Sequence, residues 1–177
     1  MREPVFTETI QIALVVRDIE ATMRTYVQDY GIGPWDVYEF NPDTVRDMHE
    51  DGKPVERSWR FALAQVGQVQ WELIQPLDED SIYARFLAEK GEGLHHVGVA
   101  VPSYDATIDE LGERGRRVVF GGELAGGVEQ RREPCLPALV HVAGVCDAQG
   151  QIAPDRWGVG AGDLRHGGAG RQQLEQV

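Results

Sequence analysis

The chain has 177 residues, a size that fits one domain or two small modules around a shared core. Its formal net charge of −12 argues against nucleic acids and anionic membranes as partners, because both bind basic surfaces. No apolar run reaches the roughly 20 residues that a membrane-spanning helix needs. The two cysteines, Cys135 and Cys146, form neither a disulfide framework nor a metal-binding pair, so we expect a reduced, cytoplasmic protein.

The first ninety residues predict a βαβββ unit that is followed by a linking helix. Short runs of β-branched and aromatic residues predict the strands, and helical spacing of apolar residues predicts the helices. Asp18 is the expected N-cap of the first helix. The expected elements are strands at 10–16, 35–40, 59–66 and 70–74, helices at 19–30 and 81–90, and a loop or hairpin excursion at 41–56.

The start of this unit is repeated later in the chain. Gln11-Ile-Ala-Leu-Val-Val16 aligns with His96-Val-Gly-Val-Ala-Val101 at a constant offset of 85 residues. An internal repeat fixes the architecture before any single element does, and this one predicts two similar modules. The second module is expected to hold strands at 95–101, 118–120 and 139–145 and a helix at 104–114.

The composition changes within the second module, where the repeat predicts continuity. Residues 116–177 contain no lysine and 12 of the 21 glycines. We expect a first module at 1–90, an incomplete or remodelled second module at 91–150, and an irregular or disordered tail at 151–177, with no regular element beyond Asp147. Two explanations stay open for the change after about residue 122: a shifted reading frame, or a genuinely remodelled module.

Four motifs together resemble the vicinal oxygen chelate superfamily: Asp18, Gly31-Ile-Gly-Pro-Trp35, Trp71-Glu-Leu-Ile-Gln-Pro76 and Gly93-Leu-His-His-Val-Gly-Val99. This superfamily includes glyoxalase I, bleomycin-resistance proteins, extradiol dioxygenases and methylmalonyl-CoA epimerase. The similarity covers roughly residues 9–122 and is strongest to the epimerase-like branch. It implies an α+β fold in which paired βαβββ modules form a cupped mixed sheet around one divalent metal ion, with the second module atypical after about residue 122.

The resemblance also implies that four metal ligands come from the first and last strands of the two modules. Gln11, Glu72 and His96 match the first three positions. The fourth ligand would be a glutamate near Trp157, where the sequence has none, and His141 in the last expected strand is a candidate replacement. A mixed nitrogen and oxygen set suits Mn, Co, Ni, Fe or Zn. Each of these residues also has a purely structural interpretation as an ordinary strand or core side chain.

Proton transfer in the epimerases uses two glutamates, according to the resemblance. One of the matching positions is Arg60 in this chain. We expect Arg60 either to pair with an anionic group of the substrate or to be an ordinary exposed arginine on an edge strand. The other matching position is the glutamate missing near Trp157. Glu72, a candidate ligand, is also a candidate catalytic residue. Strand alternation predicts that His95 faces away from His96 and has a structural role.

The implied function is a metal-dependent epimerase or isomerase, similar to lactoylglutathione lyase, acting on a small carboxylic or acyl-thioester substrate through an enolate-type intermediate. One alternative is a non-catalytic binding protein of the bleomycin-resistance type. Another is an extradiol-type dioxygenase, and Gln11 counts against it because that chemistry needs histidine there. A homodimer is expected, since members of the superfamily often pair and open sheet edges invite pairing.

Overall fold

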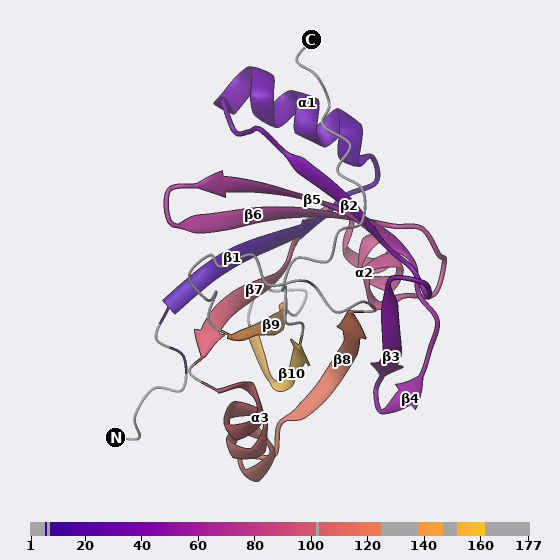
Figure 1. The fold of residues 1–177 in the computed structure, drawn as a ribbon, viewed down its shortest axis with the longest axis vertical. Helices are drawn as coiled ribbons and strands as arrows, with labels where there is room; N and C mark the ends of the chain where they lie inside the picture. The colour runs from indigo at the N-terminus through magenta and orange to yellow at the C-terminus, as the bar shows by residue number, and fades with distance from the viewer. Residues whose placement is uncertain (1–5, 7, 102, 125–137, 147–151, 162–177) are drawn as a thin grey trace.

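The computed structural model describes residue 6 and residues 8–101, 103–124, 138–146 and 152–161, with backbone only from residue 122 onward (Figure 1). Its strands are β1 (Glu8–Val15), β2 (Asp36–Phe40), β3 (Val45–Glu50), β4 (Lys53–Pro54), β5 (Trp59–Val66), β6 (Val69–Pro76), β7 (Gly93–Val101), β8 (Arg117–Leu124), β9 (Ala138–Cys146) and β10 (Ile152–Ala161). Its helices are α1 (Ile19–Tyr30), α2 (Ile82–Lys90) and α3 (Tyr104–Glu113). None of these helices is long and apolar enough to cross a membrane.

Each helix begins at the polar residue that the sequence offers as a cap. The side chain of Asp18 accepts a hydrogen bond from the Ala21 amide at the start of α1. Ser81 and Ser103 do the same for α2 and α3. These side chains satisfy backbone N–H groups that have no partner within the helix, which is why the helices begin where they do. Helix α1 ends at Gly31, whose φ of 67° is the left-handed conformation that glycine adopts readily.

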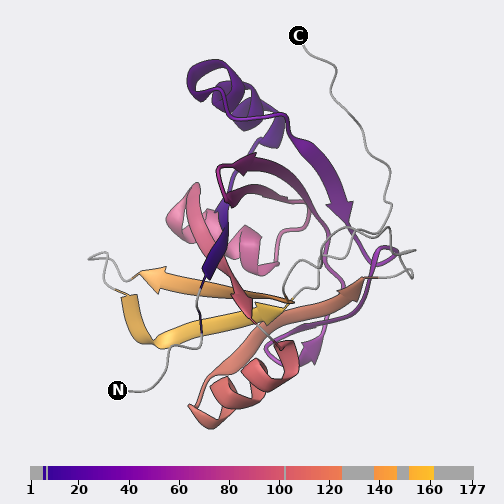
Figure 2. The ribbon, with the colours of Figure 1, turned by 60° about the vertical axis from the view of Figure 1, so that its left-hand side comes forward.

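All ten strands form one mixed sheet in the order β2-β5-β6-β1-β7-β9-β10-β8-β3-β4. The first strands of the two predicted modules, β1 and β7, pair in antiparallel orientation. Strand β2 is at one edge of the sheet and β3 lies beside the other edge, although only residues 41–44 separate them in the chain. The sheet must therefore curl until its two ends approach each other, and Figures 1 and 2 show the resulting cup.

The cup has an inner and an outer face, and alternate residues of each strand serve one or the other. The outer face of the first module packs against α1, where Ile19 and Met23 contact Leu73 and its neighbours. The outer face of β7 packs against α3 through Leu111. The inner face carries an apolar cluster that includes the aromatic side chains of Trp59 and Phe61 and that α2 joins through Tyr83. The expected α+β fold with a cupped mixed sheet is confirmed.

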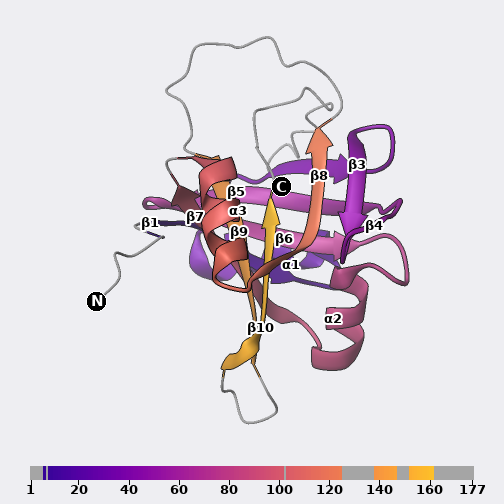
Figure 3. The same cartoon turned by 90° about the horizontal axis from the view of Figure 1, so that it is seen from below.

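The second module departs from the first in its strand directions. Strand β6 runs parallel to its neighbour β1, whereas β9, at the corresponding place beside β7, runs antiparallel. The expectation of no regular element beyond Asp147 is wrong for 152–161, which form β10 between β9 and β8 (Figure 3). That stretch lacks an apolar–polar alternation, and pairing along both of its edges makes it a strand despite its composition. Residues 162–177 lie outside the described part of the chain.

Candidate metal centre

Three neighbouring strands bring Gln11, Glu72 and His96 to the inner face of the cup. Ala13 of β1 pairs with Glu72 of β6 on one side and with His96 of β7 on the other. Directly opposed residues of neighbouring strands share a face, so the carboxylate and the imidazole flank the small alanine side chain. Gln11 lies two residues before Ala13 and therefore projects to the same face. The structure thus brings together the three side chains that the sequence selects as ligands.

The side chains of Glu72 and His96 are in direct contact inside the protein. Their Oε2 and Nε2 atoms are 3.4 Å apart, and the two residues are only 6% and 4% exposed. Burial lowers the pKa of His96 to about 4, which keeps its imidazole neutral at neutral pH. A neutral imidazole next to a carboxylate is a pair of donors suited to a divalent cation.

Gln11 completes the group with an oxygen. Its Nε2 donates a hydrogen bond to Oε1 of Gln70 over 3.0 Å, which fixes the orientation of the amide. The amide oxygen of Gln11 is buried and accepts no hydrogen bond from the described residues, in a side chain that is 1% exposed. A buried acceptor without a donor is costly, so this oxygen is available to a partner other than the described residues.

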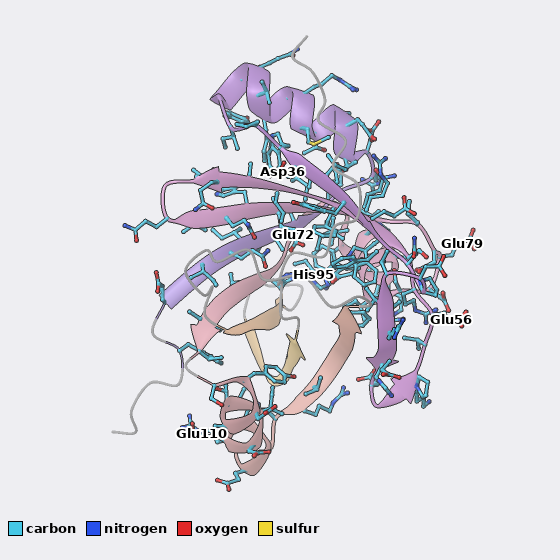
Figure 4. All side chains as sticks on the ribbon, in the orientation of Figure 1. Asp36, Glu56, Glu72, Glu79, His95 and Glu110 are labelled. Carbon is cyan, nitrogen blue, oxygen red and sulfur yellow. The ribbon has the colours of Figure 1, made fainter. Side chains whose placement is uncertain are left out.

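His95 is not turned away from His96, contrary to the expectation from strand alternation. Ala13 pairs with His96, but the next residue, Leu14, pairs with Leu94, so His95 is the extra residue of a β-bulge. The bulge interrupts the period-two pattern. His95 is buried on the inner side, whereas Leu94 is 57% exposed. Figure 4 shows Glu72 and His95 near the middle of the molecule, on β6 and β7.

The imidazoles of His95 and His96 touch each other through their Nδ1 atoms, which are 3.0 Å apart. The ring of His95 also packs on those of Tyr83 and Phe86 from α2. Burial, and secondarily the neighbouring His96, lowers the pKa of His95 to about 3. The sequence points to this pair only through the His-His doublet, because the bulge that joins the two rings leaves no pattern of its own.

Tyr83 is a second neighbour of the site that the apolar pattern of α2 does not single out. The pattern selects Ile82, Phe86 and Leu87 as the inward residues, yet Tyr83 is the buried member of this helix. Burial, then the charges of Glu72 and Glu50, raise its pKa, so the phenol stays protonated.

Arg60 lies apart from the three candidate ligands. It alternates with Trp59 and Phe61, which belong to the inner cluster, so its side chain is on the outer face of β5. There its Nη1 contacts Oε1 of Glu20 in α1 at 2.5 Å. The structure therefore does not bring Arg60 to Glu72, and its ion pair connects helix α1 to the sheet.

The described residues supply no fourth ligand of the expected type. They contain no group of three or more His, Cys, Asp or Glu side chains that could hold a metal ion. Strand β10 does cover the expected position near Trp157, but it contains no glutamate. The backbone of β9 pairs His141 with Gly98. The repeat aligns Gly98 with Ala13, and Ala13 pairs with Glu72. The backbone of His141 therefore occupies the position beside β7 that corresponds to the position of Glu72 beside β1.

The spacing between Glu72 and His96 is compatible with two ligands of one divalent metal ion. Two ligand atoms that each lie about 2.1 Å from one ion at a tetrahedral angle are about 3.4 Å apart. The distance between Nε2 of His96 and Oε2 of Glu72 equals this spacing, and it exceeds the usual length of an N–H···O hydrogen bond. The buried amide oxygen of Gln11 adds a third donor of a compatible kind.

Comparison with known proteins identifies the family. The model of the Glyoxalase/Bleomycin resistance protein/Dioxygenase superfamily matches residues 10–132, more than half of the chain, and the chain therefore belongs to this superfamily. The protein YqjC of Bacillus subtilis (strain 168), itself described as uncharacterized, is 48% identical over 42 residues. That match spans 24% of this chain and 30% of the length of YqjC.

Solved structures of methylmalonyl-CoA epimerases share the fold. The enzyme from Mycobacterium tuberculosis superposes with a TM-score of 0.55 at 22% identity, over 92% of this chain and 93% of the other. A variant of the Streptomyces coelicolor enzyme in complex with 2-nitronate-propionyl-CoA gives 0.52 at 20% identity, over 88% and 98% of the two chains. At this level of identity the likeness shows the fold and leaves the chemistry to be argued from the site.

Proposed function

We propose that the protein is a metal-dependent epimerase or isomerase that acts on a small carboxylic or acyl-thioester substrate. The observation that carries this proposal is the meeting of Gln11, Glu72 and His96 on the inner face, with 3.4 Å between the carboxylate and the imidazole. Strands, rather than loops, position all three side chains. A rigid frame of this kind suits a site that must hold an ion in a fixed geometry.

The residues on the inner face of the cup have different roles in this proposal. Gln11, Glu72 and His96 would hold the divalent ion, which when bound supplies positive charge to a substrate oxygen that becomes negative. Trp59 and the other aromatic side chains of the inner cluster exclude water from the neighbourhood and strengthen the electrostatic interactions there. We propose Glu72 as the group that holds the transferred proton. Arg60 has no part in the proposal, because it pairs with Glu20 on the other face.

A fourth ligand stays a prediction from the sequence, which offers His141 in place of the glutamate that the superfamily resemblance implies. The identity of the metal, a homodimeric state and a cytoplasmic location stay predictions from the sequence.

Exchange of a substrate proton with solvent tests the proposed reaction. We would incubate the metal-loaded protein in D₂O with a panel of 2-substituted carboxylic acids and acyl-CoA thioesters, and follow loss of the α-proton signal by NMR. Deuterium incorporation into one class is expected, with a large loss in Glu72→Gln. Glu79→Gln makes the same chemical change at an exposed position and should retain exchange (Figure 4). No exchange with any substrate class in metal-loaded protein would contradict the proposal.

A non-catalytic binding protein is the second candidate. The observation that favours it is the small number of strong metal ligands among the described residues. Of the three candidate ligands only Glu72 and His96 are a carboxylate and an imidazole, and Gln11 offers an amide oxygen. The aromatic side chains of the inner cluster, such as Trp59 and Phe61, are of the kind that contacts apolar or aromatic ligands. Tight binding of such a ligand by metal-free protein, without proton exchange in D₂O, would favour this candidate over the enzyme.

A further inference from the structure

We infer that His95 is a positioning residue that sets the tautomer of His96, so that Nε2 of His96 is the nitrogen available to the metal. This inference rests on the proposed function, because it concerns how one ligand of the proposed metal centre is prepared. It assigns a role to a side chain that is not one of the three candidate ligands.

The first support is the bulge in β7. Regular alternation would place His95 on the outer face beside α3, with Val97 and Val99. The extra residue instead brings His95 to the inner side, with its Nδ1 atom 3.0 Å from Nδ1 of His96. Bulges commonly re-aim a side chain next to a functional site, and here the result is a contact between two imidazoles.

The second support is the proton count of that contact. A hydrogen bond between two neutral imidazole nitrogens contains one proton, so one ring donates and the other accepts. If Nδ1 of His96 donates, its Nε2 carries a lone pair and faces Oε2 of Glu72, as a metal ligand requires. If Nδ1 of His95 donates instead, the proton of His96 is on Nε2, where it blocks binding. Metal binding through Nε2 therefore requires His95 to be the acceptor.

The third support is the rigid setting of the His95 ring. Its centroid lies 5.1 Å from that of Tyr83 and 5.0 Å from that of Phe86, both on helix α2. These contacts, together with the burial of the side chain, restrict the motion of the ring. A buried ligand histidine usually has its second nitrogen bonded to a carbonyl, a carboxylate or water. In this protein a second histidine takes that place.

Two substitutions separate hydrogen bonding from packing. His95→Phe keeps a flat ring against Tyr83 and Phe86 but removes the acceptor. His95→Asn keeps an acceptor near the position of Nδ1 but removes the ring. The probe is Co(II) chloride, added to metal-free protein and followed by its visible absorption in competition with a chelator. We expect His95→Phe to weaken Co(II) binding by about 10- to 100-fold, and His95→Asn to retain most of the wild-type affinity.

A second measurement needs no substitution. In wild-type protein loaded with Zn(II), ¹⁵N NMR of the imidazole nitrogens should show His96 protonated at Nδ1 and bound to metal through Nε2. Binding of His96 through Nδ1, or equal Co(II) affinity in wild type and His95→Phe, would overturn the inference alone. Failure of the wild-type protein to bind Co(II) or Zn(II) would overturn both the inference and the proposed function.

Discussion

The two buried histidines should make the metal-free protein unstable in mild acid. Burial, with the neighbouring His96 as a smaller cause, lowers the pKa of His95 to about 3, and burial lowers that of His96 to about 4. An unfolded chain has its histidine pKa near about 6.5. Below that pH the unfolded state takes up protons that the folded state does not, so the free energy of unfolding falls as the pH falls.

The pKa values give the size of this effect. Between pH 8 and pH 5 each histidine costs the folded state about 2 kcal/mol, and both together cost up to about 4 kcal/mol. This is a large part of the roughly 5–15 kcal/mol that typically stabilises a folded domain. The loss should begin as the pH drops through about 6.5 and continue toward the folded-state values. His95→Phe should remove about half of it, because one of the two groups is gone.

Urea denaturation monitored by tryptophan fluorescence, in the presence of EDTA and at several pH values from 8 to 5, measures this dependence. The control is His49→Gln, which removes an exposed imidazole on β3. His49→Gln should keep the wild-type pH dependence, and His95→Phe should flatten it. A free energy of unfolding that is the same at pH 8 and pH 5, or an unchanged slope in His95→Phe, would refute the assignment of both histidines as buried and neutral.

Two further predictions concern ion pairs elsewhere in the molecule. Glu50 is buried and contacts both Arg57 and Arg85. Glu50→Gln should lower the free energy of unfolding by about 2 kcal/mol, since Arg85 remains half exposed to solvent; a thermal melt that matches wild type would contradict this. Arg60→Met should change stability by less than about 1 kcal/mol, because its pair with Glu20 is partly exposed. Arg60→Met should also leave the affinity for Co(II) unchanged. A clear loss of Co(II) binding would show that Arg60 contributes to the metal site.

The first module was predictable because its signals are local. Asp18 caps α1 and Gly31 ends it, at the two positions that the sequence indicates. The strand predicted at 59–66 has these bounds in the structure. The repeat placed Gln11 and His96 on paired strands of the two modules, and that pairing is what brings them together. The repeat therefore singles out Gln11 and His96, and Glu72 follows only from the resemblance to the superfamily.

The remaining features depend on pairing between distant segments. The bulge at His95 follows from the register of β7 against β1, which no local pattern records. Strand β10 is defined by its two neighbours, because its own residues do not alternate. Strand β3 pairs with β8, far away in sequence, and so joins the chain that follows β2 to the opposite end of the sheet. The sequence fits several such pairings, and only the assembled sheet selects one of them.

The change of composition after about residue 122 leaves two explanations with different consequences for the gene. A shifted reading frame predicts that another frame of the same DNA encodes a strand with a glutamate flanked by apolar residues, as the superfamily resemblance implies. A remodelled module predicts that no such strand exists in either alternative frame. Translating the three frames of the gene downstream of Gly122 decides between them.

Metal content tests the central claim most directly. The protein should be purified, incubated with Mn, Co, Ni, Zn or Fe(II), desalted and analysed by mass spectrometry of its metals, beside Glu72→Gln, His96→Asn and the exposed control Glu79→Gln. The account predicts close to one divalent ion per chain in the wild type and in Glu79→Gln, and a loss of that ion in both site variants. Wild-type protein that retains no metal under any of these conditions would contradict the account and leave a binding module in its place.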